Sequence, residues 1–237
     1  MQFICTIIAT AILLSIFPSS SHASELSEWL RAAAYVYISH EGGHQDRATA
    51  KGVSYEWSYA GGGFGFIPDW RIGYKPIPKM SSKVESEYQI LKFVSLNKIA
   101  SSPQIEAMRS DLNEFIQKQN DAVADGLRTQ ASIAGGGYAA QQKAVEELPD
   151  GEFKRKTIML SAALKGLYVP WYFAQPGTGD IARLLPVAPF SLISSALLAS
   201  ATTDAWRASQ DVIPNWRIDF LSDERSGAVG LALAGRF

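Results

Sequence analysis

The stretch Ile38-Ser39-His40-Glu41-Gly42-Gly43-His44-Gln45 decides how this chain is interpreted, because it contains the pattern His-Glu-x-x-His. Residues four apart lie on one face of an α-helix, so His40 and His44 can both point towards a single metal ion. Glu41 follows the first histidine, where its carboxylate can act as general base on a water bound to that metal. The pattern predicts a helical zinc site with two histidine ligands and Glu41 as the catalytic group.

The histidine content strengthens this prediction. The chain has three histidines, and His22 lies in a segment that indicates a signal peptide, so the other two are the only histidines expected in the mature protein. Two alternatives remain open. Gly42 and Gly43 each cost a helix interior about 1 kcal/mol relative to alanine, so the stretch can be a loop with incidental histidines. Two core histidines bonded to backbone groups, without a metal, are the other alternative.

The first 23 residues indicate export. An apolar run from Phe3 to Phe17 is followed by Ser21-His22-Ala23, whose small residues fit signal-peptidase cleavage after Ala23. The run is short for a membrane span, although a retained anchor is the alternative. We predict a signal peptide at 1–23 and an exported protein, periplasmic or associated with the cell envelope. The only cysteine, Cys5, lies in the apolar run, so a metal site in the mature protein must use nitrogen and oxygen ligands.

The composition is that of an ordinary globular protein. The formal net charge is −1, and 47% of the residues are apolar and 11% aromatic. A charge this close to zero gives no electrostatic basis for binding nucleic acid, so none is expected as a partner. Residues 24–237 suffice for one domain with a substantial core, and we predict a single, mostly helical, metallopeptidase-like domain.

Apolar periodicity predicts an α+β fold that is predominantly α-helical. The His-Glu-x-x-His pattern adds the expectation that the first helix resembles the active helix of the zincins. Apolar residues recur at steps of three and four from Leu26 onwards and continue into His40 and His44. They predict a first helix over 24–50 with both histidines on its inward face. Alternating aromatic residues then predict a small β-hairpin over 53–67.

The remaining segments are predicted in the same way. Further helices are expected at 82–99, 102–127, 156–174 and 184–206. The glycine run 135–137 either allows close helix packing or marks a break. Alternating residues near the C-terminus predict a second strand pair around a turn at 223–227.

A catalytic zinc ion needs a third protein ligand as well as an open position for water. With no third histidine, this ligand must be an aspartate or a glutamate. We favour Asp204, the only charged residue between Arg183 and Arg207, because a lone carboxylate in an apolar stretch is costly unless it is paired, protonated or metal-bound. Glu146 is the second choice. The other candidates are Glu147, Glu106 and Glu114.

The sequence His40-Glu41-Gly42-Gly43-His44, with Ala48 and Gly52 after it, resembles the first motif of the site-2 protease family of zinc metalloproteases. In that family a similar helix leads to a glycine-rich strand, and the segment 61–66 looks alike. The resemblance implies hydrolysis of peptide bonds, with two histidine zinc ligands and Glu41 as base. The second half departs from the family, because Ser191 stands near the expected aspartate ligand and several membrane spans are not evident.

Two functions are therefore carried forward. The first is an exported zinc-dependent peptidase that acts on a peptide or protein substrate and contacts a membrane surface. The alternative is a non-catalytic envelope or membrane-associated protein on a degenerate peptidase-like scaffold. In a third hypothesis the segment 184–206 enters a membrane, although its serines and threonines make it less lipid-like than its length suggests.

Overall fold

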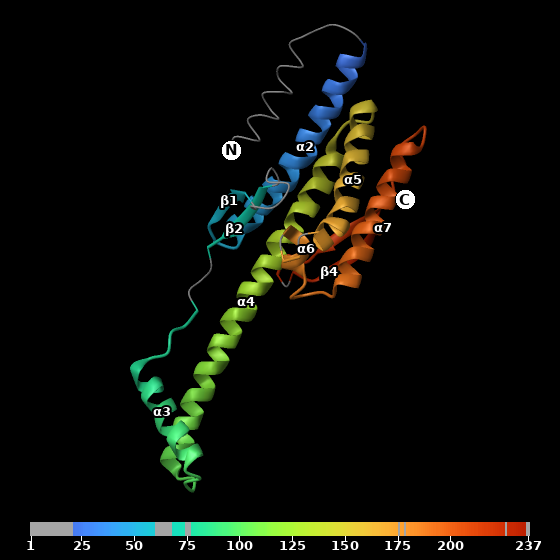
Figure 1. Cartoon of the computed structure of the whole chain (residues 1–237). Helices are drawn as coiled ribbons and strands as arrows, with labels where there is room; N and C mark the ends of the chain where they lie inside the picture. Colours follow the sequence, from blue (N-terminus) through green and yellow to red (C-terminus); the bar gives the residue numbers. More distant parts are fainter. Residues whose placement is uncertain are drawn as a thin grey trace. The chain divides into compact units, whose positions relative to one another are not determined.

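The computed structural model describes residues 21–59, 68–73, 77–174, 176–177, 179–225 and 227–235. Within them the protein is predominantly helical and has two small antiparallel sheets (Figure 1), which confirms the predicted fold class. The chain divides into two compact units, residues 1–73 with 128–237, and residues 74–127. The predicted single domain, residues 24–237, comprises both units. Residues 1–20 of the predicted signal peptide lie outside the described part.

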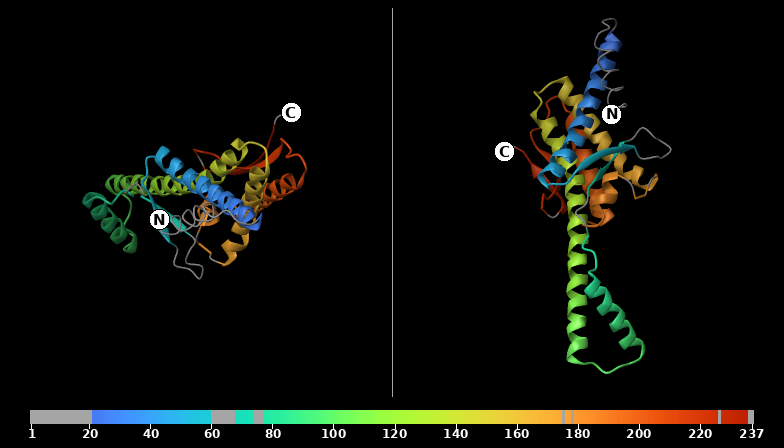
Figure 2. Two further views of the ribbon diagram at one scale, coloured as in Figure 1. Left: turned by 90° about the horizontal axis from the view of Figure 1, so that it is seen from above. Right: turned by 90° about the vertical axis from the view of Figure 1, so that its left-hand side faces the viewer.

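The larger unit is built on helices that are packed against one another. Its elements are α2 (Ser21–Ala50), β1 (Tyr55–Tyr59), β2 (Pro68–Ile72), the C-terminal part of α4 (Pro103–Glu147), α5 (Glu152–Ala174), α6 (Gly179–Leu184), α7 (Phe190–Ser209), β3 (Arg217–Ser222) and β4 (Val229–Ala234). Helix α5 packs against both α2 and α7, and α7 packs in turn against β3 and β4 (Figure 2).

Helix α4 differs from the prediction. A helix was expected to end near Leu127, with the glycines at 135–137 either packed or at a break. The structure instead has one continuous helix, Pro103–Glu147, that passes through all three glycines. The prediction of an end near Leu127 was wrong. The glycines lower helix propensity, but close packing of another helix against them stabilises the helical conformation and leaves no room for a side chain.

The segment 184–206 also divides differently. The structure has the short helix α6 up to Leu184 and then α7 from Phe190, with Pro189 at the N-cap of α7. Pro186 and Pro189 separate the two helices because proline lacks an amide N–H and clashes inside a helix. No helix in the described part of the chain combines the length and hydropathy that crossing a membrane requires.

The structure has two β-hairpins, and the second lies where alternating residues predicted a strand pair near the C-terminus. In the second hairpin Phe220 pairs with Leu231; Phe220 is buried and its neighbour Leu221 is exposed, so the side chains alternate across the pair. In the first hairpin, Tyr55 on β1 pairs with Ile72 on β2. The second strand expected at 64–67 lies outside the described residues.

A buried apolar cluster connects α4, α6, α7 and β3. It includes Ile133 from α4, Ile181 and Leu184 from α6, Leu197 from α7 and Phe220 from β3. Ile181 and Leu184 are 1% and 0% exposed, and burying such side chains stabilises the fold by about 1.5–3 kcal/mol each. This anchor fixes the position of Asp180, the residue just before Ile181.

The smaller unit contains α3 (Ser82–Leu96) and the N-terminal part of α4. Helix α3 begins after Ser81, whose hydroxyl accepts a hydrogen bond from the Val84 amide at 3.3 Å. The helix therefore begins at Ser82, as predicted, with Ser81 as its N-cap. Lys83 Nζ lies 2.5 Å from Asp111 Oδ2 and connects the two helices.

Candidate metal centre

The His-Glu-x-x-His stretch lies within α2, which stays helical through both glycines. The prediction of a first helix with both histidines facing inwards is confirmed, and the loop alternative is wrong. Packing explains why position 43 is a glycine: a Cβ there would lie 2.4 Å from Gly136 O and 2.5 Å from Ala140 Cβ. Helix α2 therefore crosses α4 too closely for any side chain at position 43. Gly42 has open space around it.

Gly137 on α4 makes the room that the imidazoles occupy. A Cβ at this position would lie 2.4 Å from His44 Cε1 and 2.9 Å from His40 Cε1. Of the two readings left open for the glycine run, close packing is the correct one. The glycines of both helices thus let the two histidine rings fit between α2 and α4.

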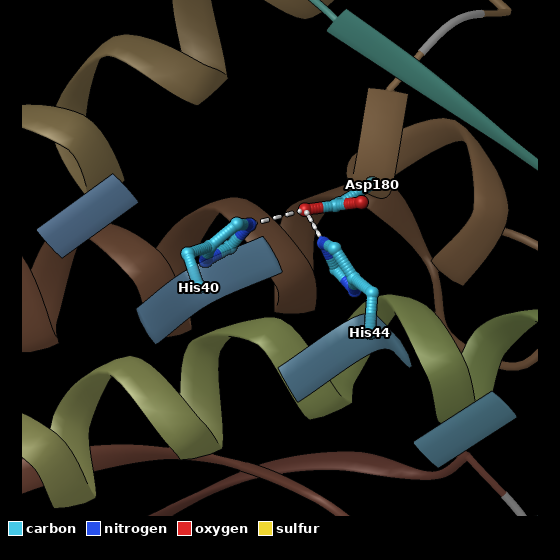
Figure 3. Close-up of side chains that lie close together, drawn as sticks. All are labelled: His40, His44 and Asp180. Carbon is cyan, nitrogen blue, oxygen red and sulfur yellow. Dashed lines mark hydrogen bonds and ion pairs between the residues drawn. The ribbon is translucent and has the colours of Figure 1, made fainter. Parts of the chain in front are cut away.

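Asp180, the second residue of α6, completes the centre (Figure 3). Its Oδ2 lies 2.9 Å from His40 Nε2 and 3.4 Å from His44 Nε2. The three side chains are almost fully buried, and one ligand atom from each lies within 4.8 Å of the others. The group can hold a metal ion.

The other ring nitrogens decide which tautomer each histidine adopts. His40 Nδ1 lies 2.9 Å from Gln141 Oε1, and His44 Nδ1 lies 2.8 Å from the carbonyl oxygen of Ile133. The Gln141 amide nitrogen donates to Ser161 Oγ at 2.7 Å, which leaves its oxygen facing His40. Both contacts are with acceptors, so each neutral ring carries its proton on Nδ1 and presents the lone pair of Nε2 to the centre.

Three electron-pair donors therefore converge in a buried space. Two Nε2 lone pairs and a carboxylate oxygen repel one another unless a cation or a proton lies between them. Four ligands at zinc distances of 2.0–2.1 Å, arranged tetrahedrally, are separated by about 3.3 Å. The 3.4 Å separation of His44 and Asp180 matches this spacing, and the 2.9 Å separation of His40 and Asp180 is somewhat shorter.

The charge state of Asp180 suits a metal ligand. Burial raises the pKa of its carboxyl, but the charges of His44 and His40 in their protonated form, and the hydrogen bonds that they donate, outweigh burial. Together they hold the pKa of Asp180 well below its ordinary value. The carboxylate is therefore ionised and can balance part of the charge of a cation.

Glu41 lies beside the centre and is held by the first hairpin. Its carboxylate is buried, and the hydroxyl of Tyr55 on β1 donates a hydrogen bond to Oε2 at 3.2 Å. Burial raises the pKa of Glu41 to about 7, against a lowering by His40 and with a further rise caused by Asp180. A carboxyl with a pKa near neutrality can both accept and return a proton at neutral pH.

Asp204, the sequence-predicted third ligand, does not join the histidines. It is buried on α7, where its Oδ2 lies 2.7 Å from Lys165 Nζ and its Oδ1 lies 3.4 Å from Arg207 Nη1. The structure brings Asp180, and not Asp204, next to His40 and His44. The physical reason is that Lys165, on α5, and Arg207, one turn further along α7, supply the counter-charges of Asp204.

The other predicted carboxylates are also placed elsewhere. Glu146 accepts hydrogen bonds from Arg207 at 2.7 and 3.2 Å. The three remaining candidates each form an exposed ion pair with a lysine or arginine one helical turn away; they are Glu147, Glu106 and Glu114. None of the four belongs to the group around His40 and His44.

Sequence reasoning missed Asp180 for a specific reason. It follows Gly179, which has a φ of 74°, at the start of a short helix. An acidic residue in the first turn of a helix is explained by the helix dipole alone. The one sequence feature that could have indicated a buried Asp180 is its position directly before Ile181 and close to Leu184, two apolar residues that pack into the core.

Comparisons of the chain with protein-family models, with curated proteins and with solved structures gave no match in any of the three. The resemblance to the site-2 protease family therefore depends on the residues of the motif alone.

Proposed function

We propose that the protein is a zinc-dependent peptidase. His40, His44 and Asp180 are the zinc ligands, and Glu41 is the general base. The observation that carries this proposal is the convergence of three buried electron-pair donors, with both histidine Nδ1 atoms already committed to acceptors. The His-Glu-x-x-His pattern, now found on a helix, supports the assignment of Glu41.

Zinc fits this donor set better than other common ions. The site offers two imidazole nitrogens and one carboxylate oxygen, a set typical of catalytic zinc. Magnesium and calcium prefer sites made of oxygen ligands. When bound, zinc supplies Lewis acidity, which polarises the substrate carbonyl and makes a water more acidic.

The side chains divide the work of hydrolysis. Glu41 accepts a proton from the attacking water and returns it to the amide nitrogen as the C–N bond breaks, which yields a carboxylate and an amine. Tyr55 orients the Glu41 carboxylate through its hydrogen bond. Gln141 and Ile133 fix the histidine tautomers in the same way that outer hydrogen-bond partners orient metal ligands.

Metal content and proteolysis of the purified protein test the proposal. Wild type is expected to hold about one zinc ion per chain, and His44→Ala is expected to lose it. Glu41→Gln should keep the zinc while peptide hydrolysis falls by about 10²–10⁴-fold. A wild-type protein that stays free of zinc after incubation with a zinc salt would overturn the proposal.

A second candidate function is favoured by the burial of the centre. His40, His44 and Asp180 are 1–2% exposed, and structural zinc sites are closed in this way. The protein would then be a non-catalytic envelope protein that is stabilised by its metal. Equal biological activity of wild type and Glu41→Gln, with zinc present in both, would select this alternative.

The place of action is proposed from the sequence. Residues 1–23 have the features of a signal peptide, so we propose that the protein acts after export, on peptides or proteins at the cell envelope. Cell fractionation with an antibody against the protein, together with mass spectrometry of its N-terminus, tests this. A mature protein that keeps residues 1–23 in the cytoplasm would contradict it.

A further inference from the structure

Tyr168 on α5 reaches the centre from a third helix. Its hydroxyl oxygen lies 3.3 Å from His40 Nε2, the same atom that lies 2.9 Å from Asp180 Oδ2. In the neutral His40 ring with its proton on Nδ1, facing Gln141, the Nε2 atom accepts hydrogen bonds. In this tautomer, which is also the one that leaves Nε2 available to a metal, the Tyr168 hydroxyl is the donor in the contact.

We propose that Tyr168 is a further catalytic residue, whose hydroxyl donates a hydrogen bond to the carbonyl oxygen of the peptide bond being cleaved. This proposal rests on the proposed peptidase function. It assigns to this hydroxyl the stabilisation of the negative charge that builds up on the substrate oxygen.

Metal binding takes away the present acceptor of Tyr168. A metal ion at the centre uses the Nε2 lone pair of His40, and this lone pair is the hydrogen-bond partner of Tyr168 among the described residues. A donor that loses its acceptor in a largely dry site is costly until it finds another. The substrate oxygen that enters beside His40 supplies this acceptor.

Tyr168 is less deeply buried than the other side chains around His40. It is partly exposed, whereas the other side chains around His40 are buried: His44, Tyr138, Gln141 and Asp180. The side chain therefore extends from a partly exposed position to a buried hydroxyl beside His40. Tyr55, also partly exposed, has the corresponding position beside Glu41.

Neighbouring rings hold the phenol in place. The Tyr168 ring lies 5.8 Å from the His40 ring and 5.5 Å from the Tyr138 ring, centroid to centroid. Tyr138 is itself fully buried and packs on Phe220 at 5.0 Å. The hydroxyl is thus pre-positioned, which is the condition under which a donor stabilises a developing charge without reorganisation.

The test uses the full-length mature protein loaded with Co²⁺ and titrated with acetohydroxamic acid, whose oxygen atoms stand in for the substrate oxygen. Visible spectra report Co²⁺ binding and hydroxamate binding separately. In Tyr168→Phe we expect Co²⁺ affinity equal to or higher than wild type, because no hydrogen bond to His40 has to break. Hydroxamate affinity should fall by about tenfold.

Two variants control the experiment. Tyr172→Phe makes the same change one turn further along α5, where the ring stacks on Phe190 at 5.1 Å and not on the centre. It should leave both affinities unchanged. Tyr168→Gln restores an N–H donor and should recover part of the hydroxamate affinity even if the phenylalanine variant folds poorly. In peptide hydrolysis, Tyr168→Phe should lower kcat and leave KM nearly unchanged.

The outcomes separate this proposal from the peptidase function. Equal hydroxamate affinity in wild type and Tyr168→Phe overturns the role of Tyr168, and so does a loss of Co²⁺ in a folded Tyr168→Phe. A wild type that binds no Co²⁺ overturns the metal centre and the Tyr168 role together. A wild type whose hydroxamate affinity depends on Tyr168 but which hydrolyses no peptide supports the contact and overturns only the peptidase function.

Discussion

Asp180 and Asp204 are both buried aspartates, and their neighbours give them opposite roles. Asp204 faces the cations Lys165 and Arg207, so its charge is balanced within the protein. Asp180 faces the Nε2 atoms of two imidazoles, so its charge is balanced either by protons on these rings or by a cation bound between the three groups. The difference lies in the partners of each carboxylate and not in its burial.

This contrast predicts opposite effects of the same substitution. Asp180→Asn should lower zinc affinity by at least about 100-fold, since it removes the anionic ligand. Asp204→Asn should keep zinc affinity but lower the free energy of unfolding by about 3–5 kcal/mol, since it leaves Lys165 buried without its counter-ion. Zinc competition with a chromogenic chelator and urea unfolding measure the two quantities. Zinc loss in Asp204→Asn would contradict the assignment.

The crossing of α2 and α4 depends on glycine at one position of the motif and not at the other. Gly43 lies against the backbone of Gly136, while Gly42 meets no atom within 4 Å. The two glycines are adjacent in sequence but lie on different faces of one helix. Only the face towards α4 requires the absence of a side chain.

Alanine substitutions at these two positions should therefore diverge. Gly42→Ala is expected to raise the free energy of unfolding by about 0.5–1 kcal/mol, because alanine favours the helix, and to keep zinc. Gly43→Ala is expected to destabilise the protein and weaken zinc binding, because its Cβ would lie 2.4 Å from Gly136 O. Thermal unfolding with and without zinc measures both effects. Equal behaviour of the two variants would contradict this crossing geometry.

Strand β3 carries a carboxyl whose titration affects stability. Burial raises the pKa of Asp219 from its ordinary value of 3.8, and this outweighs the lowering caused by its hydrogen bond to Arg217 and by the Arg217 charge. The folded state therefore binds this proton more tightly than the unfolded state. The Asp219 contribution to the free energy of unfolding is largest below pH 3.8 and is lost as pH rises through the folded-state pKa.

Asp219→Asn should remove this pH dependence. Relative to wild type, the variant is expected to become more stable as pH rises from below 3.8 towards neutrality, because asparagine does not ionise. Urea unfolding of both proteins at several pH values measures the difference. A wild-type advantage that grows with pH would contradict the sign.

At the scale of the whole molecule, every residue of the metal centre belongs to the unit formed by residues 1–73 and 128–237. Three of its elements, α2, α4 and α6, are distant in sequence and meet at the site. A metal that binds them together binds the folded unit and not the unfolded chain. Binding of a metal at this candidate centre would therefore be coupled to folding of the unit.

Zinc should consequently raise the unfolding temperature. At a free zinc concentration 100 times Kd, the stabilisation is expected to be about 2.7 kcal/mol. A strong chelator should reverse it in wild type and have no effect on His44→Ala. Scanning calorimetry at fixed pH measures this, with Mg²⁺ as the control ion. An unfolding temperature that zinc leaves unchanged in wild type would contradict the coupling.

Much of the fold followed from local patterns. The first helix, its inward histidines and the C-terminal hairpin could be predicted because apolar periodicity records which face each segment buries. The unbroken α4 could not, because its glycines lower helix propensity locally and their benefit comes from contact with α2 and with Ser222 of β3.

For the site, the sequence alone determined the pair His40 and His44 and the neighbouring Glu41, since the helix repeat sets the spacing of residues four apart. The third ligand was decided only by tertiary structure. Asp180 follows His40 by 140 residues, and no local rule relates them. Packing of Ile181 and Leu184 into the core brings Asp180 to the histidines. Asp204 instead forms an ion pair with Lys165, which balances its charge.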